Sequence, residues 1–289
     1  MHVFLAGATG AVGRQLVPLL HRAGHRVTAA SRSEGGVAWL REQGADAVRL
    51  DVLDRGATAE AVAAAAPDAI VHQLTALADG SLAENARIRR EGTRSLVDAA
   101  RRAGVPRIVA QSICWAYGPG DEPADETEAL DTGAPEPRAT TVDGVLALEL
   151  AAAELPEAVV LRYGMLHGPG TWYEPGGLIE QRLRRGELAA DGAVTSFLHV
   201  TDAARAAVAA LYWPSGAVNI VDDEPAPARK WVPVLARALG VAAPEPSSDR
   251  PRWARGADGG LARTAYGWRP VEGSWRTSFE RLGGPRAGS

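Results

Sequence analysis

The chain has 289 residues, a formal net charge of −4 and a hydrophobic fraction of 46%. This composition is typical of one large globular domain, or of a domain with a smaller lobe, and it excludes collagen, coiled coil and a wholly disordered chain. The slight negative charge predicts no sequence-independent binding to nucleic acid or to an anionic membrane. No apolar run approaches the ~20 residues that span a bilayer. A single cysteine, Cys114, and the absence of a signal-peptide pattern lead us to expect a cytoplasmic protein.

Short β-rich runs alternate with Ala- and Leu-rich helical runs through the first half of the chain. This alternation predicts an α/β fold with a doubly wound parallel Rossmann sheet. Thr58 is expected to cap one helix, and Gly104 with Pro106 to end the longest one. In chain order, the expected elements are a strand at 2–6, a helix at 14–22, a strand at 26–30, a helix at 35–43, a strand at 47–50, a helix at 58–65, a strand at 69–72, a helix at 83–103, a strand at 107–112, a helix at 142–154 and a strand at 159–163.

The character of the chain changes near residue 165, where Gly- and Pro-rich loops begin to separate shorter elements. We expect residues 1–164 to form the Rossmann domain, with residues 196–222 returning to it. Residues 165–195 and 223–282 are expected to form a small substrate-binding lobe, and residues 283–289 a disordered tail. Tryptophan can build the core of such a lobe or line an apolar pocket, and both remain open. Six of the eight tryptophans lie in this half: Trp172, Trp213, Trp231, Trp253, Trp268 and Trp275.

A glycine-rich turn, Gly7-Ala-Thr-Gly10-Ala-Val-Gly13, follows the first expected strand and opens a helix. Glycine permits positive φ and lets the backbone approach a pyrophosphate closely. The helix start adds free N–H groups and a positive dipole end. In this strand–turn–helix context the pattern predicts a dinucleotide site. The expected contacts are Gly7, Thr9, Gly10, Ala11, Val12 and Gly13.

The end of the second expected strand indicates which dinucleotide binds. NAD sites usually carry an acid there for the adenosine ribose, whereas this chain reads Ser31-Arg32-Ser33. Arg32 can pair with a 2′-phosphate, and Ser31 can donate beside it. We therefore predict that NADP(H) is preferred, with NAD(H) left open, and that Asp51-Val52 lies by the adenine. The alternative is that Arg32 is one more solvated arginine in a chain whose only lysine is Lys230.

Further motifs follow in order along nearly the whole chain: Val71-His72, Glu91-Gly92-Thr93, Tyr117-Gly118, Leu161-Arg162-Tyr163, Gly168-Pro169-Gly170, Phe197-Leu-His199-Val200-Thr-Asp202, Asn219-Ile-Val-Asp-Asp and Gly267-Trp268-Arg-Pro270. Together with the glycine turn, they resemble the extended short-chain dehydrogenases/reductases of the NAD-dependent epimerase/dehydratase family. The resemblance implies a second lobe that closes over the nicotinamide end and selects the substrate. It also implies that Tyr163 belongs to the cofactor site.

The resemblance breaks at the catalytic pair. Members of the family use Tyr-x-x-x-Lys, with the tyrosine as acid/base, but Lys230 follows no tyrosine at that spacing. Counting from Glu149, the family's Tyr and Lys positions become Thr141 and Val145. Counting back from Tyr117, the family's Ser/Thr position falls on Ile113, with Ser112 one residue early. The chain is therefore an atypical member whose acid must come from another group, or whose reaction needs none.

Three residues are candidates to replace the missing groups. Tyr117 offers a phenol after the fifth strand, and Ser112 offers a hydroxyl at a strand end. His167 offers an imidazole, which can donate or accept a proton near neutral pH. Each residue also has a purely structural interpretation, which stays open. In that interpretation Tyr117 packs in the core, His167 stacks on another ring, and Ser112 only ends its strand. His72 and His199 are interpreted as structural residues.

Two further clues concern ligands. The run Asp222-Asp223-Glu224 before Pro225 is interpreted as a turn, so no metal is predicted. The resemblance places Met165 where nucleotide-sugar enzymes commonly have a substrate-binding Asn, so a smaller, more apolar substrate is favoured. The candidate diphosphate ligands in the lobe are Arg182, Arg184 and Arg185.

Three functions follow, and the sequence leaves them open. The first is an NADP(H)-dependent oxidoreductase acting on a small organic substrate of specialised metabolism. The second is a non-redox isomerase, cyclase or dehydratase on the same fold, and the third a non-catalytic NADP(H) sensor. The expected partner is a small-molecule substrate, and homodimer formation is left open.

Overall fold

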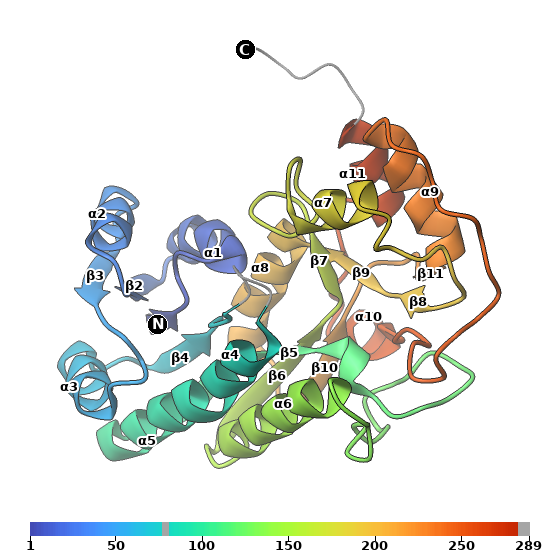
Figure 1. Ribbon diagram of the computed structural model, residues 1–289. Coiled ribbons are helices and arrows are strands. Elements are labelled where there is room, and N and C mark those ends of the chain that lie inside the picture. The colour runs from blue at the N-terminus through green and yellow to red at the C-terminus, as the bar shows by residue number, and fades with distance from the viewer. Residues whose placement is uncertain (77–80, 283–289) are drawn as a thin grey trace.

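The computed structural model describes residues 1–76 and 81–282, and its centre is a seven-stranded parallel sheet with helices on both faces (Figure 1). This arrangement confirms the predicted doubly wound α/β fold. The strand order reverses between β1 and β4, so their carboxyl ends border the place where such sheets bind dinucleotides. The residues of the expected tail, 283–289, lie outside the described part. In spatial order the strands are β10 (Gly216–Ile220), β6 (Glu157–Tyr163), β5 (Arg107–Ile113), β4 (Ala69–His72), β1 (His2–Ala6), β2 (Arg26–Ser31) and β3 (Asp46–Arg49).

Alternating apolar side chains bury both faces of the sheet. In β1, Val3 and Leu5 pack into one hydrophobic cluster, and Phe4 and Ala6 into the other. Figure 1 shows α5 and α6 side by side on one face, with α1 and α8 on the other. The first face holds α3 (Arg55–Ala65), α5 (Thr93–Ala103) and α6 (Arg138–Ala152), and the second holds α1 (Ala11–Arg22), α2 (Glu34–Glu42), α8 (Val200–Ala209) and α10 (Gly260–Ala265).

Several helix starts differ from the prediction, and α6 begins at Arg138 instead of residue 142. The first helix begins at Ala11 instead of residue 14, because the last residues of the glycine turn already form its first turn. The prediction that Thr58 caps α3 is wrong: Asp54 is the N-cap, and its carboxylate accepts from the Ala57 N–H at 3.0 Å. The Thr58 hydroxyl lies inside the helix and donates to the Asp54 carbonyl at 2.8 Å.

The long helix expected at 83–103 is interrupted. It consists of α4 (Leu82–Arg87), a π-helical turn (Ile88–Gly92) and α5. The α4 segment packs closely on α6, since a Cβ added at Gly144 would lie 2.9 Å from the Ala86 Cα. Turns of this kind inside α-helices occur frequently at functional sites.

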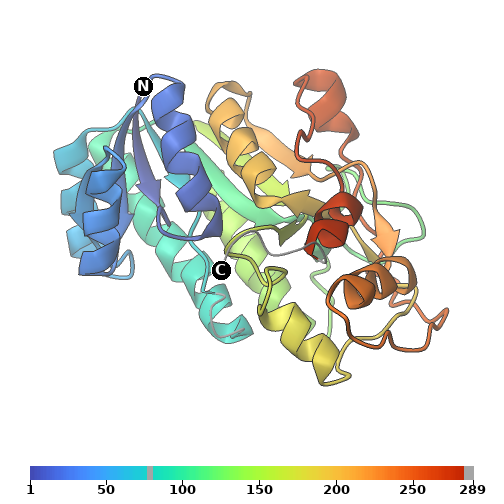
Figure 2. The same cartoon turned by 90° about the horizontal axis from the view of Figure 1, so that it is seen from above.

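The second lobe is built on short elements around an aromatic core. Figure 2 shows α7 in yellow, α9 in orange and α11 in dark red together on the side away from the blue helices. Phe197 packs edge-on against Tyr173, Trp231 and Phe279. The lobe contains β7 (Met165–His167) parallel to β9 (Phe197–His199), β8 (Val194–Thr195) antiparallel to β11 (Ala226–Pro227), α7 (Leu178–Arg184), α9 (Ala228–Ala238) and α11 (Trp275–Leu282).

The tryptophans serve mainly as core residues. Trp231 and Trp275 belong to the core of the lobe, while Trp213 and Trp268 pack against the Rossmann core. Trp253 is 37% exposed and lies beneath the Arg138 guanidinium. Within residues 1–76 and 81–282, no helix has the length and apolar character needed to cross a membrane.

Candidate active site

The glycine turn forms a tight cradle between β1, β4 and α1. Gly7 has φ +90°, and a Cβ there would lie 2.5 Å from the carbonyl group of Gln73. A Cβ at Gly13 would lie 2.6 Å from the Ala8 Cα and still closer to the Gly7 oxygen. Only glycine therefore fits at these two positions. The first N–H groups of the 12-residue α1 open beside the ends of β1 and β4.

Gln73, at the end of β4, carries a polar group that the protein leaves unpaired. The residue is 4% exposed. Its carboxamide interacts with the Tyr163 phenol, but neither the oxygen nor the nitrogen completes a hydrogen bond with a described residue. Burying an unpaired amide is unfavourable unless a ligand or water supplies partners. The backbone of Gln73 touches the cradle, so a polar ligand there is the natural partner. The motif Val71-His72 pointed to this strand end, but Gln73 itself was not predicted.

Tyr163 lies in the core beneath this strand end. It is fully buried, and its hydroxyl donates to the Ala203 carbonyl of α8 at 3.1 Å. Burial raises the pKa of the phenol above its ordinary value. The expected contact between Tyr163 and the cofactor stays a prediction.

The residues expected at the adenosine end gather at the ends of β2 and β3. Arg32 is exposed and makes no ion pair with any residue of the described part. Ser33 caps α2 by accepting from the Gly36 N–H at 3.1 Å, and Ser31 is buried beside it. The exposed Asp51 carboxylate accepts from the Leu53 N–H at 3.1 Å. The Arg32 guanidinium is thus free to meet an anion.

Val52 follows Asp51 at the expected adenosine end. Its side chain is buried against the π-helical turn, where a Cβ added at Gly92 would lie 3.2 Å from the Val52 Cγ2. The same added Cβ would lie 3.9 Å from Leu74 Cδ1, just after β4. The π-helical turn therefore borders both the adenosine end and the end of β4.

A chain of buried hydrogen bonds runs across the carboxyl ends of β5, β6 and β10. The Ser112 hydroxyl donates to Glu149 at 2.6 Å, and Arg162 donates to both Glu149 oxygens at 2.7 and 3.0 Å. Arg162 also donates to the Tyr117 hydroxyl at 2.8 Å, which in turn donates to the Asn219 oxygen at 2.7 Å. Because each group has a fixed partner, the chain holds three strand ends and α6 in one arrangement.

Two of the candidate catalytic residues are members of this chain. Tyr117 is 1% exposed, and burial raises the pKa of its phenol above the ordinary range although Arg162 opposes the shift. The proton of Ser112 is directed to Glu149. These geometries favour the structural alternatives, and catalytic roles for Tyr117 and Ser112 stay predictions.

His167 is buried in the aromatic core of the lobe. Its ring lies 5.1 Å from the His199 ring and 5.9 Å from that of Phe279, centroid to centroid. Neither ring nitrogen has a hydrogen-bond partner among the described residues. Burial lowers the pKa of His167 to about 3, so the imidazole is neutral at neutral pH. Its catalytic role likewise stays a prediction.

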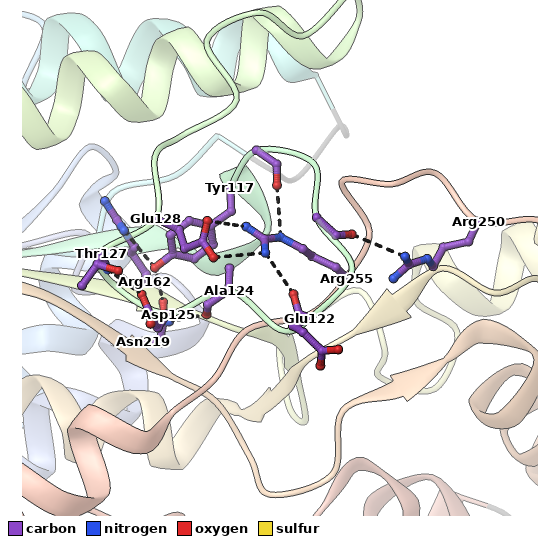
Figure 3. A network of polar contacts seen from close by, with 12 residues as sticks. Tyr117, Glu122, Ala124, Asp125, Thr127, Glu128, Arg162, Asn219, Arg250 and Arg255 are labelled. Atoms are coloured by element: carbon purple, nitrogen blue, oxygen red, sulfur yellow. Dashed lines mark hydrogen bonds and ion pairs between the residues drawn. The ribbon is translucent and has the colours of Figure 1, made fainter.

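An acidic loop, residues 118–137, follows β5 and is fastened to the second lobe (Figure 3). Arg255 donates to the Gly118 carbonyl at 3.1 Å and the Glu122 carbonyl at 3.0 Å, and pairs with Glu128 at 3.0 Å. Asn219 donates to the Ala124 carbonyl at 3.1 Å, so β10 holds the same loop from below. The loop is therefore a fixed wall beside the carboxyl ends of the strands.

The residues interpreted as structural make structural contacts. His72 accepts from the Leu74 N–H at 3.1 Å and shares a hydrogen bond with the Thr93 hydroxyl at 2.8 Å. Asp222 accepts from the N–H groups of Glu224 and Trp275 at 3.0 and 3.1 Å. No group of three or more His, Cys, Asp or Glu side chains suited to a metal ion occurs within residues 1–76 and 81–282.

The reversal of strand order, the glycine cradle at that point and the lobe beyond the strand ends define a Rossmann protein of the extended short-chain dehydrogenase/reductase class. The chain belongs to the NAD dependent epimerase/dehydratase family, whose model matches residues 3–220.

Relatives extend this assignment. The chain is 44% identical, over 308 aligned positions, to a Streptomyces protein named 3-diazoavenalumate denitrifying reductase; the alignment covers 97% of this chain and 100% of the relative. Its fold is similar to that of UDP-glucose 4-epimerase from Thermotoga maritima with UDP-glucose (TM-score 0.75, 22% identity, 98% and 96% of the two chains covered). It is also similar to the Thermus thermophilus UDP-glucose 4-epimerase complex with NAD (TM-score 0.73, 23% identity, 98% and 99% covered).

Proposed function

We propose that this protein is a nicotinamide-dependent reductase that prefers NADP(H) and removes the nitrogen of a small organic acid bearing a diazo group. The observation that carries the proposal is the 44% identity, over nearly the whole of both chains, to a relative named a denitrifying reductase of a diazo compound. Since the two chains align from end to end, the proposal extends to both the cofactor domain and the substrate-binding lobe.

The residues of the cradle fit the cofactor. Gly7 and Gly13 let the turn pack closely on the end of β4 and on the start of α1, which exposes the N-terminus of α1 to a pyrophosphate, and the Gln73 amide can satisfy a polar group of the nucleotide. Arg32 is an unpaired cation at the position where NAD sites usually have an acid, which favours a 2′-phosphate. Glu34, the nearest acid in sequence, is paired with Arg49 at 3.0 Å.

The missing acid fits a diazo substrate. A carbonyl builds negative charge on oxygen when hydride adds, so a carbonyl reductase depends on a positioned acid worth roughly 10²–10⁴ in rate. A diazonium group is a cation and becomes neutral on accepting hydride, so no acid is required. Bound reduced nicotinamide supplies that hydride, and the net reaction converts R–N₂⁺ into R–H and N₂ with formation of oxidised nicotinamide. Val145 and Thr141, which the resemblance places at the Lys and Tyr positions, are consistent with a reaction of this kind.

The candidate basic side chains of the lobe are already in ion pairs, which does not favour binding of a nucleotide diphosphate. Arg184 pairs with Glu180 at 2.7 Å, and Arg185 pairs with Glu187 at 2.7 Å. Arg182 also lies 3.8 Å from Glu187. These ion pairs occupy the three candidate arginines, which favours a small acid over a nucleotide sugar.

Two measurements test the proposal. Calorimetric titration with NADPH, NADP⁺, NADH and NAD⁺ should show binding that prefers the phosphorylated pair. With NADPH and an aryl diazonium carboxylate, the enzyme should consume reduced nicotinamide and release N₂ in equal amounts. Turnover without a change in nicotinamide absorbance would favour the isomerase, cyclase or dehydratase instead, and saturable binding of a UDP-sugar would refute the substrate class.

A further inference from the structure

Arg89 is a buried cation in the interrupted helix. It is 3% exposed and lies in the π-helical turn Ile88–Gly92, between α4 and α5. This is the turn that borders Val52 and Leu74, so Arg89 belongs to the wall between the adenosine end and the end of β4. The neighbouring Arg90, by contrast, is exposed to solvent.

Among the described acids, Glu149 attracts the Arg89 guanidinium electrostatically. The guanidinium makes no hydrogen bond or ion pair with residues 1–76 or 81–282. The ionisable side chains that affect its charge are His72 at the end of β4 and Glu149 on α6. Glu149 already accepts from Arg162 and Ser112. His72 is uncharged at neutral pH, because burial and the nearby Arg89 lower its pKa to about 4.

Such an arrangement is unfavourable for a protein without a ligand. Burying a charge removes its hydration, and only a partner with good geometry restores the loss. Burial lowers the pKa of Arg89 to about 10, so the group still carries its charge at pH 7. A ligand that presents oxygen acceptors to the end of β4 would supply the missing partner.

We propose that Arg89 binds oxygen atoms in the nicotinamide half of the dinucleotide and that its charge makes the site prefer the reduced cofactor. The inference rests on the proposed nicotinamide dependence. Thr93, which directly follows the π-helical turn, shares a hydrogen bond with His72, and the charge of Arg89 lowers the pKa of that histidine. The next residue, Gln73, forms the side of the glycine cradle. The oxidised nicotinamide ring is a cation and the reduced ring is neutral, so a buried guanidinium nearby disfavours the oxidised form.

This placement also relates to the missing lysine. The resemblance puts the family's lysine at position 145 of α6, which is a buried valine here. Arg89 approaches from the neighbouring helix and interacts electrostatically with Glu149, four residues further along α6. In this proposal, Arg89 in the π-helical turn supplies the positive charge that the family's lysine supplies from α6.

The test compares Arg89→Met, Arg89→Lys and the exposed control Arg90→Gln with the wild type, using calorimetric titration with NADPH and NADP⁺. The wild type should bind NADPH more tightly. R89M should weaken NADPH binding on the order of tenfold or more and bring the NADPH/NADP⁺ affinity ratio towards one. R89K should keep the preference, and R90Q should match the wild type.

Thermal unfolding without ligand separates a binding role from a structural one. If Arg89 is an unpaired charge held for the cofactor, R89M should unfold at the wild-type temperature or above it. A lower unfolding temperature for R89M, or dinucleotide affinities equal to those of the wild type, would overturn the inference. Unchanged dinucleotide affinity with lost binding of the diazo acid would assign Arg89 to the substrate and overturn it as well. A wild type that binds no dinucleotide would refute the proposed function itself.

Discussion

Replacing Gly13 with alanine tests the cradle directly. The added Cβ would lie 2.6 Å from the Ala8 Cα and carbonyl carbon and closer still to the Gly7 oxygen, and all of these are backbone atoms. They cannot rotate away as a side chain does. Gly7 cannot retreat either, because its own position is set by φ +90° and by the Gln73 backbone behind it. To accept the methyl group, α1 must move off the turn.

The size of the effect follows from this overlap. Overpacking in a well-packed core costs about 1–3 kcal/mol, and the absence of side-chain relief places Gly13→Ala at the upper end. A loss of about 3 kcal/mol corresponds to a fall of roughly 5 °C in Tm for a chain of this size, because the entropy of unfolding is about 2.1 cal/mol/K per residue. Separation of α1 from the turn should also abolish measurable dinucleotide binding, because the N–H groups would no longer converge.

Gly35→Ala is the matched control for differential scanning fluorimetry and calorimetry. Gly35 is exposed in α2, and no atom lies within 4 Å of an added Cβ. Alanine favours a helix by roughly 0.5–1 kcal/mol over glycine, so the control should unfold at the wild-type temperature or slightly above it. If G13A unfolds with the wild type and binds the same dinucleotide equally well, the close contact between turn and helix does not exist as described.

Three other substitutions test separate parts of the site. Arg32→Ala should weaken NADP(H) binding about 10–100-fold, as expected for one lost charge-assisted contact, and leave NAD(H) unchanged in the same titration; equal weakening of both would remove the cofactor assignment. Tyr117→Phe should lower the free energy of unfolding by about 1–3 kcal/mol, because Arg162 and Asn219 each lose a buried partner, with kcat retained; a large fall in kcat at unchanged stability would make Tyr117 the acid. For Asp222, burial raises the pKa of the carboxyl group to about 7 from an ordinary value of 3.8. Its contribution to stability is therefore present below pH ~4 and is lost as the pH rises through 7. Asp222→Asn should flatten the pH dependence of Tm in that window, and an unchanged profile would contradict burial of Asp222 as the cause.

The fold is readable from the sequence because its signals are local. The alternation of strands and helices and the glycine turn each depend on neighbours within about one element. The exact helix starts are harder to predict from the sequence. Asp54 and Thr58 are both good N-cap residues, and only the packing of α3 decides between them.

The polar chain of the site depends on contacts that no local pattern encodes. The sequence leaves Tyr117 open between a catalytic role and packing in the core, because the acceptor of its proton, Asn219, comes from β10 far along the chain. Ser112 is likewise left open between a ligand contact and a strand end, and its hydroxyl donates to Glu149 of α6. The sequence therefore places polar groups at strand ends, while tertiary structure decides which partners they have.

Arg89 was missed although a signal was present. It lies on the buried face of its helix with Asn85, Gly92 and Leu96, at helical spacing. Arginine is almost always exposed, so in a chain rich in arginine the one on the apolar face was not singled out. A charged residue on a stripe of buried positions is a useful signal, because it needs a partner that the stripe does not provide.

The preference for reduced cofactor separates the reductase from its non-redox alternative. An enzyme that oxidises its substrate transiently and then returns the hydride must begin each cycle with oxidised nicotinamide. A buried cation near the ring disfavours that form and also makes the bound reduced form a weaker hydride donor. A strongly electrophilic diazonium acceptor tolerates the weaker donor, because loss of N₂ makes the reaction irreversible. The proposed place of Arg89 near the end of β4 is therefore suited to net reduction, and tighter binding of NADP⁺ than of NADPH by the wild type would argue for the isomerase.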